Sequence, residues 1–125
     1  MRSYEGLLAW QKAIDLVEQV YQASRSWPQD EMFGLRNQIR RAAVSAPSNI
    51  AEGRGRTGSS EYLHHLSIAH GSLCEVGTQL VIAQRLGYLN EPTCRALKEQ
   101  IDEVGRLIGG LIRSLRTPRK GPVAD

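Results

Sequence analysis

The chain has 125 residues, of which 41% are hydrophobic and 23% are charged, and its formal net charge is +3. This composition predicts one globular domain and argues against an intrinsically disordered chain. The sequence has no apolar run long enough to span a membrane, and its first residues lack the apolar segment of a signal peptide. We therefore expect a cytoplasmic protein in which Cys74 and Cys94 are reduced.

The first predicted helix carries apolar residues at alternating steps of three and four, which is typical of an amphipathic helix with one buried face. We expect the buried positions to be Leu7, Trp10, Ile14, Val17 and Tyr21. The helix should end around residues 26–28, where Ser-Trp-Pro interrupts the pattern. Further apolar residues fall outside this stripe, namely Leu8, Leu16 and Val20.

The second helix is expected to begin near Asp30, which is a suitable N-cap residue. Its apolar positions are Leu35, Ile39, Ala42 and Ala46. Pro47 follows inside the pattern, where a proline removes a backbone hydrogen bond and costs about 3 kcal/mol in a regular helix. Because the pattern continues through Asn49 and Gly53, we predict a helix that is kinked at Pro47 rather than split in two.

A glycine-rich loop from Arg54 to Ser60 separates the second helix from the third. The third helix is expected to begin at Ser59 or Ser60 and to end at Gly87, because glycine is the usual residue just beyond a helix end. Its buried positions would be Tyr62, Leu66, Ala69, Leu73, Val76, Leu80 and Ala83.

The fourth helix is expected to begin at residues 90–92, where Asn-Glu-Pro supplies an N-cap and a first-turn proline. Its buried positions would be Cys94, Leu97, Ile101, Val104, Ile108, Leu111 and Leu115. Leu107 and Ile112 add apolar surface at its flanks. Glycine in a helix interior costs roughly 1 kcal/mol relative to alanine, so Gly105 and Gly109 suggest that another backbone approaches closely. The extra apolar surface is open to two interpretations, a wide core stripe within the monomer or a subunit interface.

No segment shows the alternation typical of a β-strand, and the connections between the helices are short. Short connections favour antiparallel neighbours. We therefore predict an all-α fold, an antiparallel up-down-up-down four-helix bundle with crossing angles near ~20°. The bundle would span residues 1–117, and residues 118–125 would form a flexible C-terminal tail.

The second predicted helix and the residues that follow it are strongly basic. Residues 36–56 contain five arginines and a single acidic residue, Glu52. These are Arg36, Arg40, Arg41, Arg54 and Arg56. One interpretation is a phosphate-binding track, since guanidinium groups form paired hydrogen bonds with phosphate. The other is an ordinary solvated face whose arginines pair with acids such as Glu52 and Glu61. The sequence alone leaves both interpretations open.

No group of residues has the pattern of a catalytic or metal site. Glu61 and His64 have the Glu-x-x-His spacing of di-iron bundles, but that site needs two inward-facing copies. The buried stripe puts both residues on outer positions, and no second copy occurs in the sequence. We expect no enzyme activity, no cofactor and no metal ion. An inward-facing cluster of Glu52, His65 and Arg41 would argue for catalysis instead.

Several stretches are similar to those of one bacterial protein family. The longest is Q-I-R-R-A followed by S-x-P-S-N-I-A-E-G within residues 38–53, and W-Q-K-A at residues 10–13 and L-S-I-A-x-G-S-L at residues 66–73 also match. The chain resembles the four-helix bundle proteins first noticed as open reading frames within intervening sequences of 23S ribosomal RNA genes. The residues that we take as the structural signature are Pro47, Asn49, Glu52, Gly53 and Gly71.

The resemblance implies an antiparallel four-helix bundle with no established biochemical activity. Relatives of the family include the accessory variability determinant of diversity-generating retroelements, which looks like a homopentamer with a basic surface that binds nucleic acid and a reverse transcriptase. By analogy, this chain would form a homopentamer that binds RNA or DNA weakly, and a reverse transcriptase partner follows only from that analogy. The alternative is a structural or protein-interaction module whose arginines form intersubunit salt bridges.

Overall fold

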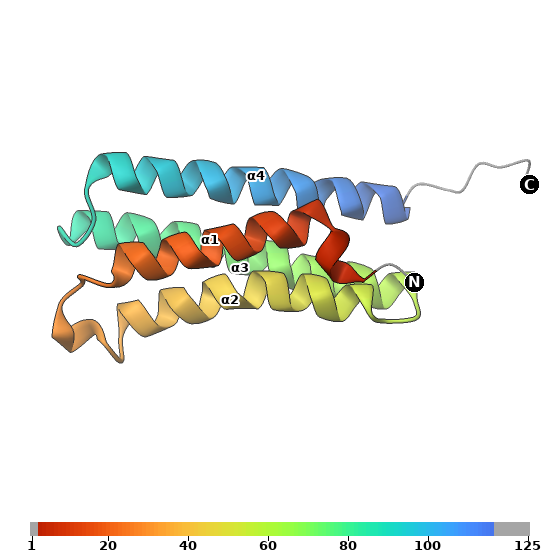
Figure 1. The fold of residues 1–125 in the computed structure, drawn as a ribbon, viewed down its shortest axis with the longest axis horizontal. Helices are drawn as coiled ribbons and strands as arrows, with labels where there is room; N and C mark the ends of the chain where they lie inside the picture. The colour runs from red at the N-terminus through yellow and green to blue at the C-terminus, as the bar shows by residue number, and fades with distance from the viewer. Residues whose placement is uncertain (1–2, 117–125) are drawn as a thin grey trace, which may run out of the picture.

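The computed structural model describes residues 3–116, which form helices and no strand. The helices are η1 (Tyr4–Gly6), α1 (Leu8–Ser24), η2 (Gln29–Glu31), α2 (Leu35–Arg54), α3 (Ser59–Arg85) and α4 (Glu91–Arg116), where η marks a short 3₁₀ helix. Successive long helices run in opposite directions along one axis (Figure 1). The all-α four-helix prediction is confirmed, and the predicted tail at residues 118–125 lies outside the described residues.

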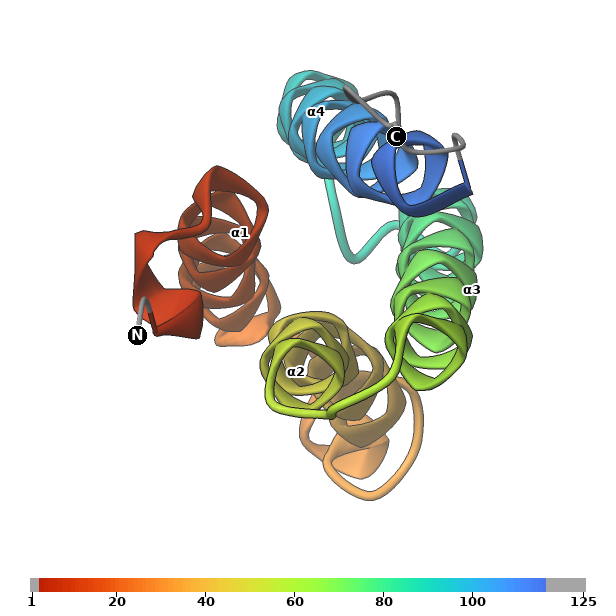
Figure 2. The same cartoon turned by 90° about the vertical axis from the view of Figure 1, so that its right-hand side faces the viewer.

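The helices follow one another around the bundle, with α2 between α1 and α3 in the end-on view of Figure 2. The most extensive contact is between α2 and α3, and α4 contacts both α3 and α1. The buried positions of α2 include the small residues Ala43, Ala46 and Gly53, and Gly53 lies against Tyr62 and His65 of α3. Small side chains let two helix backbones approach closely, which is consistent with the extensive contact between α2 and α3.

Gly53 lies very close to α3. A methyl group in its place would lie 2.8 Å from Cβ of His65 and 2.9 Å from Cδ1 of Tyr62. It would also lie 3.3 Å from the backbone carbonyl oxygen of Tyr62. No side chain fits there without moving α3, so glycine is required by the contact and not by backbone conformation.

Pro47 lies inside α2, which continues through it as one helix. Of the two outcomes considered for this proline, a helix split in two is therefore wrong, and the kink stays a prediction. The turn around Pro47 gains a side-chain hydrogen bond, since Nδ2 of Asn49 donates to the carbonyl oxygen of Ser45 at 2.9 Å. This bond adds local stabilisation where the proline removes a backbone donor.

The buried stripe of α1 differs from the predicted one. The buried residues are Ala9, Ala13, Leu16, Val20 and Ser24. Leu7, Trp10, Ile14 and Val17 are only partly buried, and Tyr21 is exposed. Two apolar stripes adjoin on this helix, and the one that contains the small alanines faces the core because it allows the closer approach. Of the residues set aside as extra apolar surface, Leu16 and Val20 thus belong to the monomer core, whereas Leu8 is exposed.

The start of α2 also differs from the prediction. Asp30 lies in the short helix η2, and the first turn of α2 is capped by Glu31, whose Oε1 accepts a hydrogen bond from the Leu35 N–H at 2.9 Å. Oε2 of Glu31 accepts a second bond from the Tyr88 hydroxyl at 2.8 Å. The backbone bond from Leu35 and then the bond from Tyr88 lower the pKa of Glu31. The bond to Glu31 raises the pKa of Tyr88.

The predicted ends of α3 and the start of α4 are confirmed. All seven positions predicted as the stripe of α3 are buried. Gly87 has a φ of +83° and follows the end of α3, where the Tyr88 N–H bonds to the Ala83 carbonyl at 2.9 Å and the Gly87 N–H to that of Gln84 at 3.0 Å. This pair of bonds is the Schellman termination of a helix. Oδ1 of Asn90 accepts from the Thr93 N–H at 2.9 Å and so caps α4.

Four of the positions predicted for the α4 stripe are buried in the core, and they are Cys94, Leu97, Val104 and Ile108. The other three, Ile101, Leu111 and Leu115, are partly buried and pack against the core, as do Leu107 and Ile112.

Among residues 3–116, α3 is the only helix long and apolar enough to cross a membrane. Because its apolar stripe faces the bundle core, this criterion is weak, and the absence of a membrane span stays a prediction.

We predict that Gly53→Ala lowers the free energy of unfolding by about 1–3 kcal/mol, since the added methyl overpacks the α2–α3 contact. Gly71→Ala is the matched control, because Gly71 is also inside a helix but a Cβ there meets nothing within 4 Å. This control should stabilise the fold by about 0.5–1 kcal/mol through the higher helix propensity of alanine. Urea denaturation of both variants measures the difference, and a stabilised Gly53→Ala would contradict the close contact.

We also predict that the stability contributed by Glu31 depends on pH. A carboxyl whose pKa is lowered on folding stabilises the folded state above its ordinary pKa of 4.5 and loses that contribution as the pH falls through the lowered value. Glu31→Gln should therefore be less stable than the wild type at pH 7 and should approach it in acid. Asp30→Asn, which removes a neighbouring charge but no cap, should show no such convergence in denaturation curves measured across this pH range.

Candidate functional site

The five arginines do not form one continuous track. Arg36 is bound to the connection between α1 and α2, where its Nη2 donates to the carbonyl oxygens of Trp27 at 2.8 Å and Pro28 at 3.2 Å. Nε of Arg40 donates to Oγ of Ser24 at 2.9 Å. These two guanidinium groups are thus committed, at least in part, to groups of the same chain.

Arg40 makes three contacts with the end of α1. Besides the bond to Ser24, its Nη2 donates to the Tyr21 carbonyl at 3.1 Å, and its Cζ lies 4.4 Å from the centroid of the Tyr21 ring. Ser24 is fully buried and donates its own hydroxyl proton to the Val20 carbonyl at 2.8 Å. Arg40 therefore fastens α1 onto α2, a role that sequence interpretation missed because it considered only phosphates and carboxylates as partners.

Arg41 has a different environment, although it is the next residue. It is exposed, and within residues 3–116 it has no hydrogen bond or ion pair. It lines a cleft of about 540 Å³ between α2 and α3, which we call the polar cleft. The residues that line it are Phe33, Asn37, Gln38, Arg41, Ala42, Ser45, Ser72 and Glu75. Arg41 is therefore available to an external anion.

Arg54 and Arg56 lie at the opposite end of α2 and are both exposed. Burial raises the pKa of the Tyr62 hydroxyl, and the positive charge of Arg54 opposes this shift. Arg56 lines a shallow pocket together with Ser60, Glu61 and His64. These two arginines form a second basic site, separated from Arg41 by most of the length of α2.

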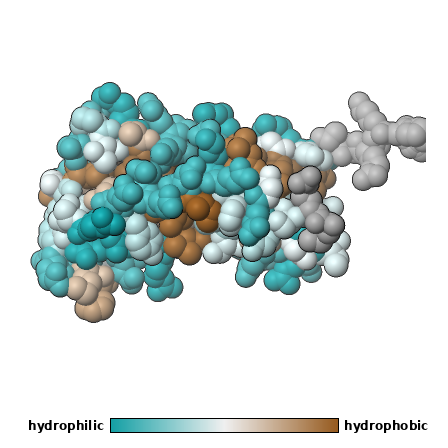
Figure 3. Space-filling model, in the orientation of Figure 1, coloured by the Kyte–Doolittle hydropathy of each residue, from teal (hydrophilic) through white to brown (hydrophobic). Residues whose placement is uncertain are grey.

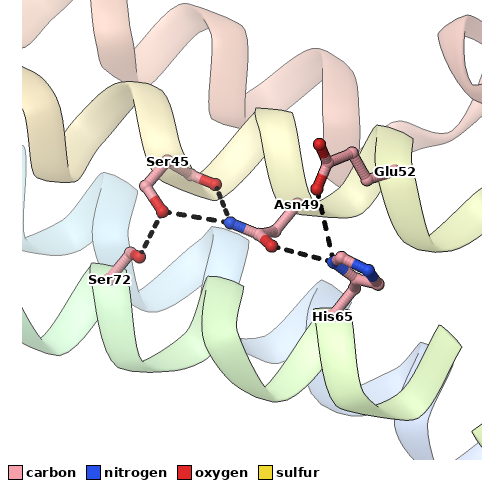
Figure 4. A network of polar contacts seen from close by, with 5 residues as sticks. All are labelled: Ser45, Asn49, Glu52, His65 and Ser72. Atoms are coloured by element: carbon pink, nitrogen blue, oxygen red, sulfur yellow. Dashed lines mark hydrogen bonds and ion pairs between the residues drawn. The ribbon is translucent and has the colours of Figure 1, made fainter. Parts of the chain in front are cut away.

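A chain of polar contacts joins the middle of α2 to α3 (Figure 4). Oγ of Ser72 donates to Oγ of Ser45 at 2.8 Å, and Nδ2 of Asn49 lies 3.1 Å from the same oxygen. Nδ1 of His65 lies 2.9 Å from Oδ1 of Asn49 and 3.5 Å from Oε1 of Glu52. Since the amide nitrogen of Asn49 donates to Ser45, its oxygen accepts, and this pattern assigns a proton to Nδ1 of His65.

The polar network explains two residues of the structural signature. Asn49 satisfies groups on both helices, which is the role of a structural hydrogen-bonding residue. Glu52 reaches His65, yet its side chain is 61% exposed. Arg41 lies in the polar cleft and not in this network, so the structure does not form the inward-facing cluster of Glu52, His65 and Arg41 that would argue for catalysis.

The two residues considered for metal binding, Glu61 and His64, line one shallow pocket together with Arg56. Glu61 and His64 are exposed on α3. Among residues 3–116, no group of three or more histidine, cysteine, aspartate and glutamate side chains could hold a metal ion.

A second groove, with a volume of about 730 Å³, lies between α3 and α4. Gly77, Gly105 and Gly109 line it. A Cβ at Gly77 or Gly105 would meet only one side-chain atom, at 4.0 Å, from Ile101 or Leu73 respectively. The close backbone approach expected at Gly105 and Gly109 is therefore not supplied by the described part of this chain.

The polar cleft and the polar network lie on one line of α2 that could have been found in the sequence. Polar residues recur there at steps of three and four, and they are Gln38, Arg41, Ser45, Asn49 and Glu52. Such spacing places side chains on one face of a helix. The pattern predicts a polar stripe but not its α3 partners, which are Ser72 and His65.

We predict that Arg40→Ala lowers the free energy of unfolding by about 1–2 kcal/mol, because it removes two hydrogen bonds and a cation–π contact. Arg41→Ala is the matched control, since it is the same substitution one residue away on the same helix. It should change stability by less than about 0.5 kcal/mol, as is usual for exposed positions without partners. Chemical denaturation decides the point, and equal effects of the two substitutions would contradict the assignment of Arg40 as a fastening residue.

The comparisons with known proteins agree with this fold. The family model described as 23S rRNA-intervening sequence protein matches residues 5–110. No curated protein matches the chain. The chain is similar to the 1.70 Å crystal structure of a protein with unknown function from the S23 ribosomal protein family of Bacteroides thetaiotaomicron.

That similarity has a TM-score of 0.78 at 18% sequence identity and covers 85% of this chain and 96% of the other. At such an identity it shows the fold alone, so the family assignment depends on the family model. Since that model matches most of the chain, the resemblance noted in the sequence is confirmed. The chain belongs to the family of 23S rRNA-intervening sequence proteins.

Proposed function

We propose that this protein is a non-enzymatic, homo-oligomeric helical scaffold that binds RNA or DNA weakly and without sequence specificity. The observation that carries the proposal is the exposed guanidinium group of Arg41 in a polar cleft, where it has no partner within residues 3–116. Arg54 and Arg56 add exposed positive charge at the other end of α2. Arg36 and Arg40 contribute less, because their guanidinium groups already bind backbone and hydroxyl groups of the chain.

Electrostatics support weak and non-specific binding. The formal net charge of +3 is modest for one chain. Five copies would carry about +15, and assembly into a ring would concentrate that charge on one rim or channel. Neutralising phosphates releases bound counterions, which gives affinity without sequence information and makes it fall steeply with salt.

The glycine-lined groove between α3 and α4 supports assembly from several copies. Its floor includes the apolar side chains of Leu73 and Ile101, and its glycines have no backbone packed against them. A helix of a second copy would supply the close approach that these glycines permit. The pentameric state follows from the resemblance to the retroelement protein and is part of the proposal.

A second candidate function is a structural or protein-interaction module. The observation that favours it is that Arg41 and Glu75 line the same cleft and neither has a partner within residues 3–116. Two copies facing each other could pair these opposite charges reciprocally, as at a twofold interface. In that case the cleft would bind a protein surface rather than a phosphate.

We predict that the wild type binds labelled RNA and duplex DNA at low salt and that the affinity falls as salt is added. Arg41→Glu combined with Arg56→Glu should weaken binding at least about tenfold. It should also lower the number of counterions released on binding, read from the slope of log affinity against log salt concentration, by about two. Arg95→Glu is the control, since Arg95 lies on α4 and is paired with Glu91. Fluorescence anisotropy across a salt series measures both effects.

Two outcomes would contradict the nucleic-acid function. One is the absence of binding by the wild type at low salt, and the other is a doubly substituted protein that binds as tightly as the wild type. Light scattering after size exclusion distinguishes the second candidate. If Arg41→Glu changes the mass of the particle and leaves nucleic-acid affinity unchanged, the cleft is a protein interface.

A further inference from the structure

Phe33 is the most exposed large apolar residue described in the chain, with 87% of its surface accessible. It lies between η2 and α2, and its neighbour Met32 is exposed as well. Apolar atoms project from the corner of the molecule where the chain passes from α1 to α2 (Figures 1 and 3). An exposed aromatic ring would gain free energy if a ligand covered it, so Phe33 offers a face on which a flat group could bind.

The surroundings of Phe33 are polar rather than apolar. It lines the polar cleft with the amide side chains of Asn37 and Gln38 and with the guanidinium group of Arg41. Ser45, Ser72, the carboxylate of Glu75 and the small side chain of Ala42 complete the cleft. An apolar protein surface would leave the amides of Asn37 and Gln38, the guanidinium of Arg41 and the carboxylate of Glu75 unpaired, which is costly once water is excluded. The cleft therefore suits a ligand that combines a flat π-face with hydrogen-bonding edges and an anionic group.

We propose that the polar cleft binds one unpaired nucleobase and its adjoining phosphate, with the base stacked on Phe33. This inference rests on the proposed nucleic-acid function and adds a preference for single strands. Arg41 would bind the phosphate, and the amides of Asn37 and Gln38 would bond to the base edge. The carboxylate of Glu75 accepts hydrogen bonds only, so it would receive one from an amino or ring N–H group of the base.

The segment that carries Phe33 is held in place on both sides. Glu31 bonds to the Leu35 N–H and to the Tyr88 hydroxyl, which lies in the connection between α3 and α4. Arg36 bonds to the carbonyl oxygens of Trp27 and Pro28. Because residues before and after it are fixed, Phe33 can meet a base without a large loss of backbone entropy.

The far wall of the cleft is fixed by the hydrogen bond between Ser72 and Ser45. Double-stranded nucleic acid cannot use this arrangement, because its bases are already stacked on one another. Single strands offer free π-faces, and stacking of a base on an aromatic side chain tolerates all four bases. Discrimination between single strands and duplex is therefore the property that separates this inference from simple attraction of phosphates by arginine.

The test measures the affinity of the full chain for labelled twelve-nucleotide single strands of RNA and DNA and for the matched duplexes. Phe33→Ala should weaken single-strand binding about 5- to 100-fold, which is the range for losing one stacked base. Duplex binding should stay within about twofold. Phe33→Leu should behave like Phe33→Ala, because it keeps the apolar bulk and loses the aromatic face. Phe33→Trp should keep the affinity, and its extra fluorescence should be quenched by single strands and not by duplex.

The outcomes separate this inference from the function on which it rests. A wild type that binds neither single strands nor duplex overturns both. If Arg41→Glu weakens single-strand binding but Phe33→Ala does not, only the stacking inference is overturned. A change of particle mass in Phe33→Ala, measured by light scattering, would identify Phe33 as a subunit contact and would also overturn it. Folding of each variant is checked by thermal denaturation. The midpoint temperature should stay unchanged, because substitution of an exposed side chain has little effect on stability.

Discussion

The close packing of α2 on α3 at Gly53 is the constraint on which the remaining structure depends. The absence of a side chain there lets the two backbones approach, since Tyr62 and His65 of α3 would collide with any Cβ. The same approach brings Ser45 within 2.8 Å of Ser72 and Asn49 within 2.9 Å of His65. Short polar side chains bond across the interface only at this separation. The contact therefore fixes which face of α2 meets α3 and, as a consequence, which faces remain for α1 and for solvent.

The orientation of α2 gives adjacent arginines different roles. Successive residues on a helix point about 100° apart, so Arg40 faces the end of α1 while Arg41 faces the polar cleft. The guanidinium of Arg40 donates two hydrogen bonds, to the Ser24 hydroxyl and to the Tyr21 carbonyl oxygen, and lies over the Tyr21 ring. The guanidinium group of Arg41 has no hydrogen bond or ion pair within residues 3–116. Charge alone does not distinguish the two residues, whereas position around the helix does.

Sequence periodicity predicted the parts of the fold where a single apolar stripe dominates. The stripe of α3, its end at Gly87 and the cap at Asn90 are as expected, because strong periodicity and local capping residues specify them. The predicted buried stripe of α1 was wrong because two apolar stripes lie side by side on that helix, and only packing against the neighbouring helices selects which one is buried. The sequence shows the arginines as a basic cluster, but the fastening role of Arg40 depends on oxygen atoms of another helix, which no local pattern reveals. The exposure of Phe33 could not be predicted from the sequence either, because the burial of an aromatic side chain in a loop between helices depends on tertiary structure.

The central claim is that α2 uses Arg36 and Arg40 to hold the bundle and Arg41 to bind nucleic acid. Arginine side-chain Nε–H resonances report on it directly, because each guanidinium group gives its own signal in a ¹⁵N-labelled protein. We predict that titration with a single-stranded oligonucleotide shifts the Arg41 signal and leaves those of Arg36 and Arg40 in place. Shifts at Arg40 that match or exceed those at Arg41 would contradict this division of roles, as would an Arg41 signal that does not respond to the oligonucleotide.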